Sequence, residues 1–136
     1  VIYRHFSASD RFETALQLKA IADQNRLVLL IAADPVLARK VGAAGVHWPQ
    51  AQLKKARHWR GAFPINTASA HSPRAIRRAA ATGMDAALVS AIFPSNSPTA
   101  GRPIGSVRCR TIAADAPLPI YALGGVNASN AARVSA

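Results

Sequence analysis

The sequence predicts an α/β protein with a parallel sheet and about six βα units. Apolar segments that begin near positions 1, 27, 44, 63, 86 and 118 have the composition of buried strands, and helical signals follow each of them. A helix-to-strand turn at residues 42–46 is repeated at residues 83–87. This regular alternation is typical of parallel strands joined by right-handed helical crossovers.

Composition favours one domain over residues 1–136 with an intracellular, cytoplasmic location. Half of the residues are hydrophobic, yet no apolar run reaches the ~18 residues that span a bilayer, and no secretory leader is evident. The single Cys109 excludes an internal disulfide. A net charge of +11 favours anionic partners. We consider nucleic acid an unlikely partner, since the charges are spread over several helices and no zinc-finger or RNA-recognition signature occurs.

The first third of the chain predicts a strand, a helix and a second strand. A β-rich run at residues 1–6 precedes capping-box chemistry, which starts a helix that ends near Asn25. The residues with that chemistry are Ser7, Ser9, Asp10 and Glu13. Residues 27–31 are all apolar, as expected of a strand covered on both faces.

The next segment predicts two more helices around a short strand. Asp34-Pro35 begins the first helix and Gly42 ends it. A strand at residues 45–47 leads through a loop into a short basic helix at residues 51–59. We expect its cations to form a solvated face, and these are Lys54, Lys55, Arg57 and Arg60.

The central stretch carries the chemistry. An apolar strand at residues 63–70 ends in a polar tip with Ser69 and His71. Residues 72–73, Ser-Pro, then start a helix, because serine caps free amides and proline suits the first helical position. A buried strand at residues 85–90 runs into a loop rich in Ser, Pro and Gly. In such βαβ units, ligands bind at the carboxyl ends of the strands.

The last third repeats the pattern. A helix is expected at residues 104–114 and an apolar strand at residues 118–123. Gly124 and Gly125 follow, and we expect Asn127 to cap a final helix. Two adjacent glycines are explained equally by a plain turn and by backbone amides that approach a phosphate, which the dipole of the following helix would assist.

Three motifs resemble the thiamine phosphate synthase and TenI family: Ser69-Ala-His-Ser72, the loop at residues 93–97, and Ala122-Leu-Gly-Gly-Val126. Those proteins are TIM (β/α)₈ barrels that handle a phosphorylated thiazole. The resemblance therefore implies a TIM barrel that is incomplete in this chain, because a full barrel needs ~200 residues or more. The first strand and the last βα unit have no counterpart here, and we expect them to lie outside the chain.

The resemblance implies a phosphate site made of hydroxyl groups and glycines. Ser95 and Ser97 stand where the family has the two threonines of a Thr-x-Thr-Lys loop, and Gly124 and Gly125 match its Gly-Gly pair. Pro98 occupies the lysine position, and we expect nearby Arg102 to supply the lost cation.

The same comparison assigns proton transfer to His71 and substrate contacts to Ser69 and Arg4. A histidine matching His71 is the proton-transfer group of TenI-type tautomerases, and neutral imidazole suits that role near pH 7. The serine matching Ser69 contacts the pyrimidine substrate in the synthases. Local hydrogen bonding to backbone is the structural alternative for both side chains.

The magnesium-binding pattern of the family is not kept. Its Gln-x-Arg-x-Lys motif aligns with Ile2, Arg4 and Phe6, so one of the three polar groups remains. Its Asn-Asp pair aligns with Ala32-Ala33, and its second magnesium carboxylate aligns with Gln52. Asp34 is one residue out of register and is expected to point away. We therefore expect no metal site and no cofactor, with magnesium needed only by a true synthase.

The other candidate residues favour structural roles. We expect His47 and Cys109 to pack in the core and His58 to lie on the surface. His5 is a weaker candidate for a ligand contact, and Trp48 is expected at the pocket wall or the barrel mouth. The sequence thus predicts an enzyme of thiamine biosynthesis that binds a thiazole phosphate and transfers a proton without metal. The alternatives are an authentic magnesium-dependent synthase, a non-catalytic phosphate-ligand sensor and a basic nucleic-acid-binding protein. Parallel barrels of this kind often pair as homodimers, but no patch in the sequence identifies an interface, so the oligomeric state stays open. No membrane partner is expected.

Overall fold

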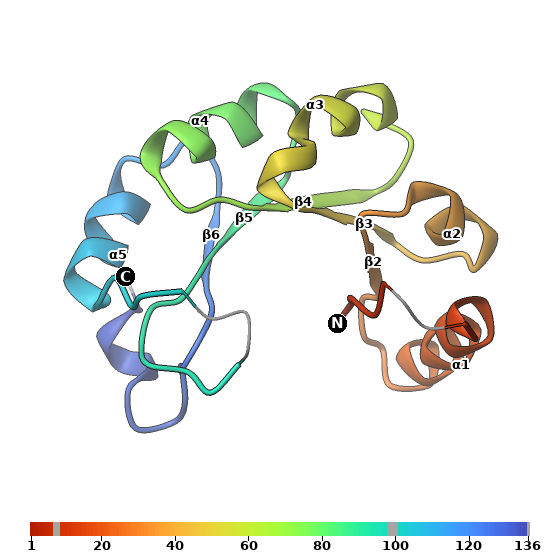
Figure 1. The fold of residues 1–136 in the computed structure, drawn as a ribbon, viewed down its shortest axis with the longest axis horizontal. Helices are drawn as coiled ribbons and strands as arrows, with labels where there is room; N and C mark the ends of the chain where they lie inside the picture. Colours follow the sequence, from red (N-terminus) through yellow and green to blue (C-terminus); the bar gives the residue numbers. More distant parts are fainter. Residues whose placement is uncertain (7–8, 98–100, 136) are drawn as a thin grey trace.

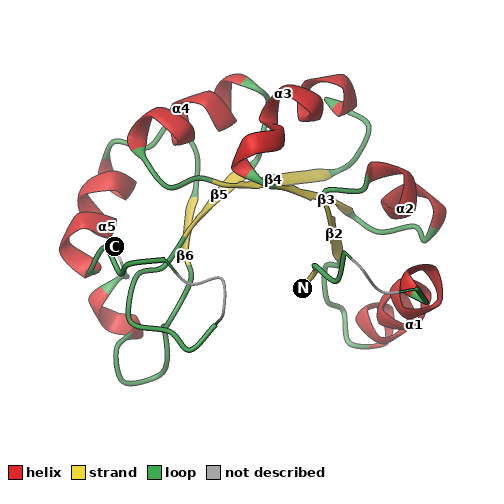
Figure 2. Cartoon of the chain, viewed as in Figure 1, coloured by secondary structure: helices red, strands yellow, loops and turns green. Residues whose placement is uncertain are grey.

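Six parallel strands form one curved sheet in the order β1-β2-β3-β4-β5-β6. The structure is a computed structural model that describes residues 1–6, 9–97 and 101–135. The strands are β1 (Ile2–Tyr3), β2 (Leu30–Ala32), β3 (Gly45–Trp48), β4 (Ile65–Ser69), β5 (Ala86–Val89) and β6 (Ile120–Ala122). The sheet curves into an open arc, and every α-helix lies on its convex side (Figures 1 and 2).

The α-helices are α1 (Arg11–Gln24), α2 (Pro35–Lys40), α3 (Leu53–Ala56), α4 (Pro73–Ala81) and α5 (Ser106–Ala114). Three 3₁₀ turns accompany them: η1 (Gln50–Gln52), η2 (Arg57–Trp59) and η3 (Ala131–Arg133). Strand and helix alternate along the chain as in a TIM barrel, and the sheet stops before it closes. The predicted fold, an incomplete barrel of about six βα units, is confirmed.

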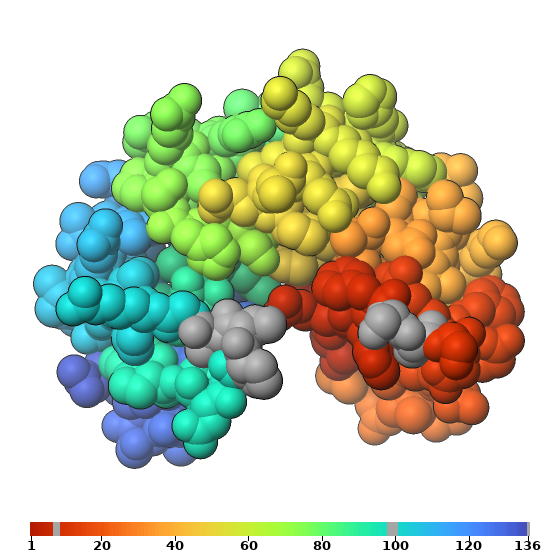
Figure 3. Space-filling view, in the orientation of Figure 1, coloured from red at the N-terminus to blue at the C-terminus, as the bar shows by residue number. Residues whose placement is uncertain are grey.

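Alternation along each strand separates a packed face from a concave face. On β3, Val46 and Trp48 are fully buried in the core beneath the helices, together with Ile31 of β2 and Ala68 of β4. Burial of each large side chain stabilises the fold by roughly 1.5–3 kcal/mol. The intervening residue His47 faces the concave side, which the space-filling view shows to be open (Figure 3).

Two predicted helix caps are present. The Asp34 carboxylate accepts a hydrogen bond from the Leu37 amide at 2.9 Å, and the Ser72 hydroxyl accepts one from the Ala75 amide at 3.2 Å. Asp10 precedes α1 without a side-chain cap bond, and it accepts from the Thr14 hydroxyl instead. Ser7 of the expected capping box lies outside the described residues.

Two predicted helices differ in the structure. The basic segment 51–59 is helical throughout, but it consists of η1, α3 and η2 and not of one continuous α-helix. Asn127 makes the bonds of a helix cap, since its side chain accepts from the Ser129 amide and hydroxyl and its backbone carbonyl accepts from the Ala131 amide at 2.9 Å. Among the described residues, the element that follows is the three-residue η3. In the described part of the chain, no helix is both long and apolar enough to span a membrane.

Candidate functional site

Two adjoining cavities lie at the carboxyl end of the sheet. The larger encloses about 340 Å³ and the smaller about 130 Å³, and Arg4, Ser90 and Leu123 line both. Arg4 follows β1, Ser90 follows β5 and Leu123 follows β6. Because the strands are parallel, their ends meet at one edge, and residues more than a hundred positions apart share one hollow.

All seven residues predicted for the site line these cavities, although their roles stay predictions. The larger cavity has Ser95, Ser97, Gly124 and Gly125, the smaller has Ser69 and His71, and Arg4 lies in both. Ser90 and Leu123 also line both cavities and were missed from the sequence. Their position directly after a strand is the signal that could have found them.

The two glycines let two loops meet. Gly124 and Gly125 have φ angles of +89° and +67°, a region that side chains with a Cβ rarely adopt. A Cβ on Gly125 would lie 2.3 Å from the carbonyl oxygen of Pro94, so the loop after β5 leaves no room for it. The Phe93 amide also donates to the Gly124 carbonyl at 3.0 Å. This contact holds the loop with Ser95 against the glycine turn.

The assistance expected from the dipole of a following helix stays a prediction. Among the described residues, the element after the glycines is the 3₁₀ turn η3, and three residues align too few peptide dipoles to form a macrodipole. Any phosphate here would depend on hydroxyl groups, backbone amides and the guanidinium of Arg4.

His71 has a defined tautomer when its ring is neutral. Its Nδ1 lies 3.0 Å from the carbonyl oxygen of Ser90, and its backbone amide donates to Oε1 of Gln50 at 3.0 Å. A carbonyl oxygen only accepts, so Nδ1 carries the proton and Nε2 carries the lone pair. The side chain is exposed at the rim, and Nε2 is therefore the atom able to take a proton from a ligand.

His47 is buried, as expected, but it also belongs to the site. Its Nδ1 lies 2.9 Å from the Thr67 hydroxyl and its Nε2 lies 2.9 Å from the Ser69 hydroxyl. Burial, helped by the positive charge of Arg4, lowers the pKa of His47 from 6.5 to about 4. The ring is therefore neutral at pH 7, and it accepts from one hydroxyl and donates to the other.

This arrangement fixes the position of the Ser69 side chain. Strand register sets Thr67 beside His47 on the neighbouring strand, with Ser69 two residues further along the same face. His47 was predicted only to pack in the core. Its hydrogen bond to Ser69 was not predicted, because it depends on the register between β3 and β4, which the sequence does not specify.

The donors expected for magnesium do not fit a metal ion. Asp34 caps α2 and forms an ion pair with Arg11 at 2.8 Å, so its carboxylate is already engaged. Ala32 and Ala33 offer no side-chain oxygen. Within the described residues, no group of three His, Cys, Asp or Glu side chains could hold a metal.

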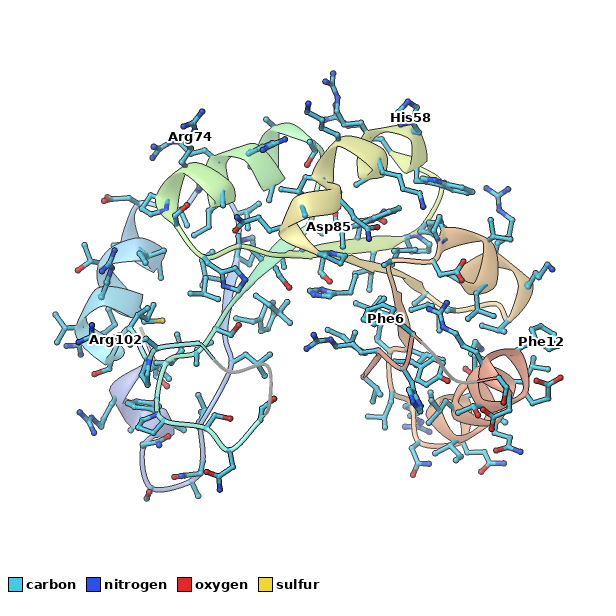
Figure 4. The ribbon with its side chains drawn as sticks, viewed as in Figure 1. Phe6, Phe12, His58, Arg74, Asp85 and Arg102 are labelled. Atoms are coloured by element: carbon cyan, nitrogen blue, oxygen red, sulfur yellow. The ribbon has the colours of Figure 1, made fainter. Side chains whose placement is uncertain are left out.

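Several secondary candidates lie away from the cavities. Trp48 packs in the core and its Nε1 donates to Oδ1 of the Asn66 side chain at 3.2 Å, so the expected place at the pocket wall or barrel mouth was wrong. Cys109 is buried among apolar residues, and burial raises the pKa of its thiol. Arg102 is exposed beside α5 and is absent from the cavity linings (Figure 4). Pro98 lies outside the described residues.

Fold and site together define a barrel-type α/β protein with a polar rim at the carboxyl ends of its strands. A sequence model of the thiamine monophosphate synthase family matches residues 1–136. The chain belongs to this family.

Curated relatives are thiamine-phosphate synthases of greater length. The Ruminiclostridium cellulolyticum protein is 30% identical over 130 residues, which cover 94% of this chain and 62% of the relative. The Marinobacter nauticus protein is 34% identical over 127 residues, covering 92% of this chain and 57% of the relative. The chain thus spans about three-fifths of the length of these relatives.

A solved structure supports the fold. The thiamine phosphate pyrophosphorylase from Pyrococcus furiosus superposes with a TM-score of 0.78 at 23% identity, over 98% of this chain and 65% of that one. At this identity the likeness shows the fold alone.

Proposed function

We propose that this protein binds a thiazole phosphate at the rim and moves a proton on it without a metal ion. The observation that carries the proposal is His71, whose Nε2 is left as the proton acceptor by the contact between Nδ1 and the Ser90 carbonyl. The phosphate would lie in the larger cavity, against Ser95, Ser97 and the glycine turn. Ser90 lines both this cavity and the smaller one, which His71 lines.

The proton transfer needs no other reactant. Nε2 of His71 would take a proton from one ring atom of the bound heterocycle while the electron pair stays in the conjugated ring system. The same nitrogen would then return the proton to another ring atom, so the product is an isomer with no net oxidation. Arg4 would offset the anionic charge, and Ser69, held by His47, would orient the ring.

The test uses NMR to measure how fast the protons of thiazole phosphate exchange with deuterated solvent when the protein and a chelator are present. His71→Ala should slow turnover by about 10²–10⁴-fold, as expected for loss of a general base, with little change in affinity measured by calorimetry. His58→Ala is the matched control, because His58 Nδ1 also lies near a backbone carbonyl, that of Lys55 at 3.3 Å, but on the exposed turn η2.

An authentic thiamine-phosphate synthase is the second candidate, favoured by the names of the relatives. Such an enzyme would join thiazole phosphate to the pyrimidine diphosphate only with magnesium, and a chelator would stop it. Product formed under those conditions alone, or full activity of His71→Ala, would contradict metal-free proton transfer. Binding without any change in the ligand would indicate a sensor, and absence of binding would contradict the anion site itself.

A further inference from the structure

The positive charge of the chain is concentrated in one segment. Residues 35–84 contain nine Lys or Arg residues and no Asp or Glu, which leaves eight basic against six acidic residues in the rest of the chain. The nine cations are Arg39, Lys40, Lys54, Lys55, Arg57, Arg60, Arg74, Arg77 and Arg78, and all are exposed. Nine of the eleven units of net charge therefore arise in this segment.

The fold gathers these charges. Helices α2, α3 and α4 lie next to one another on the convex side, and their side chains project outward (Figures 3 and 4). Lys54 of α3 and Arg74 and Arg78 of α4 line one open groove of about 620 Å³, and Gln50 and Ser72 also line it. We call this the α3–α4 groove. It shares no lining residue with the two cavities of the rim.

The groove cations are available to an outside partner. In the described part of the chain, which includes all six acidic residues, the two ion pairs are Arg11–Asp34 and Lys19–Asp23, both outside residues 35–84. A closely spaced set of unneutralised cations raises the local potential and attracts a polyanion.

The chemistry of the groove distinguishes between polyanions. A membrane-binding face would present large apolar side chains beside its cations, yet among the large hydrophobic residues of 35–84 only Val36 is strongly exposed, on α2 and outside the groove. A protein partner would also need an apolar or aromatic centre for affinity. A phosphate backbone needs only closely spaced cations, and the arginine fork matches phosphate oxygens.

We propose that the α3–α4 groove binds the phosphate backbone of nucleic acid without sequence preference. The sequence had pointed against nucleic acid because the charges fall on several helices and no recognition motif is present. Backbone binding requires no such motif, and the fold gathers those helices on one face. With no exposed aromatic ring lining the groove, base stacking contributes nothing and the interaction is electrostatic.

The test is fluorescence anisotropy of the purified protein with a labelled 20-base-pair DNA of scrambled sequence, at several salt concentrations. The variant Lys54→Gln/Arg74→Gln/Arg78→Gln should lower the slope of log K against log salt by about 2–3, since each phosphate contact contributes about 0.9. Its affinity at low salt should fall by about 10-fold or more. The matched control is Arg102→Gln/Arg108→Gln/Arg110→Gln, which removes the same charge from exposed positions near and on α5.

Retained binding in the control with loss in the groove variant supports the proposal. Equal loss of DNA binding in both variants would mean that net charge alone causes binding, and this would overturn the proposed groove. Unchanged DNA binding in the groove variant would also overturn it. Binding to vesicles with anionic lipid but not to DNA would also overturn it, in favour of a membrane surface. Circular dichroism of both variants verifies that each is folded.

Discussion

Replacement of His47 should change how the stability of this protein depends on pH. Because burial lowers the pKa of His47 to about 4, the folded protein binds fewer protons than the unfolded chain between pH 4 and pH 6.5. The free energy of unfolding therefore falls as the pH decreases through this window. For pKa values of 6.5 unfolded and about 4 folded, the loss from this one group is about 2 kcal/mol between pH 7 and pH 5.

His47→Gln removes the titrating ring and keeps a polar side chain near Thr67 and Ser69. Urea unfolding followed by tryptophan fluorescence is a suitable assay, since Trp48 is fully buried next to residue 47. The variant is expected to be less stable at pH 7, but its stability should fall by about 2 kcal/mol less than that of the parent between pH 7 and pH 5. All carboxylates are common to both proteins, so their contributions cancel in this difference.

Two results would refute this reasoning. One is a parallel loss of stability in the parent and in His47→Gln. The other is an NMR titration that places the pKa of the His47 ring near 6.5. Either result would mean that the ring is not held neutral between the two hydroxyl groups.

Three further changes test separate parts of the structure. Gly125→Ala should weaken phosphate binding in calorimetry by about 10-fold or more, since its Cβ would lie 2.3 Å from the Pro94 oxygen. The control is Gly61→Ala, because Gly61 also has a positive φ but its Cβ would meet no atom within 4 Å. This control should cost only ~1 kcal/mol of stability. Asp34→Asn should lower the free energy of unfolding by ~1–2 kcal/mol, through its lost ion pair, while ligand affinity with or without magnesium stays the same. Ser72→Ala should cost ~1 kcal/mol in urea unfolding, by loss of the α4 cap.

Elements specified by local chemistry could be predicted from the sequence. Ser72-Pro73 and Asp34-Pro35 start helices because the cap and the proline act within a single turn. The strands were found because burial on both faces requires continuous apolar runs, although β2 begins three residues later than residue 27. After Asn127 the structure describes η3 in place of the predicted helix, although the Asn127 side chain makes the capping bond to the Ser129 amide.

The site was partly predictable for a related reason. Arg4, Ser69 and His71 stand at or just after strand ends, and any parallel sheet brings such positions to one edge. The hydrogen bonds from His47 to Thr67 and Ser69 were not predictable, because they need the register between β3 and β4. Alternation alone could place His47 on the concave face but could not supply its partners.

The electrostatics of the rim agree with the loss of the family's carboxylates. Among the described residues that line the two cavities there is no acidic side chain, and Arg4 is the single cation. A rim of this kind attracts an anion directly, while a divalent cation would meet the charge of Arg4 without any carboxylate to offset it. Departure of a diphosphate places more negative charge on the rim than one guanidinium balances, whereas transfer of a proton within a bound ligand leaves the net charge unchanged. This charge balance is one reason for proposing proton transfer, and the chelator experiment on thiazole phosphate decides between it and displacement.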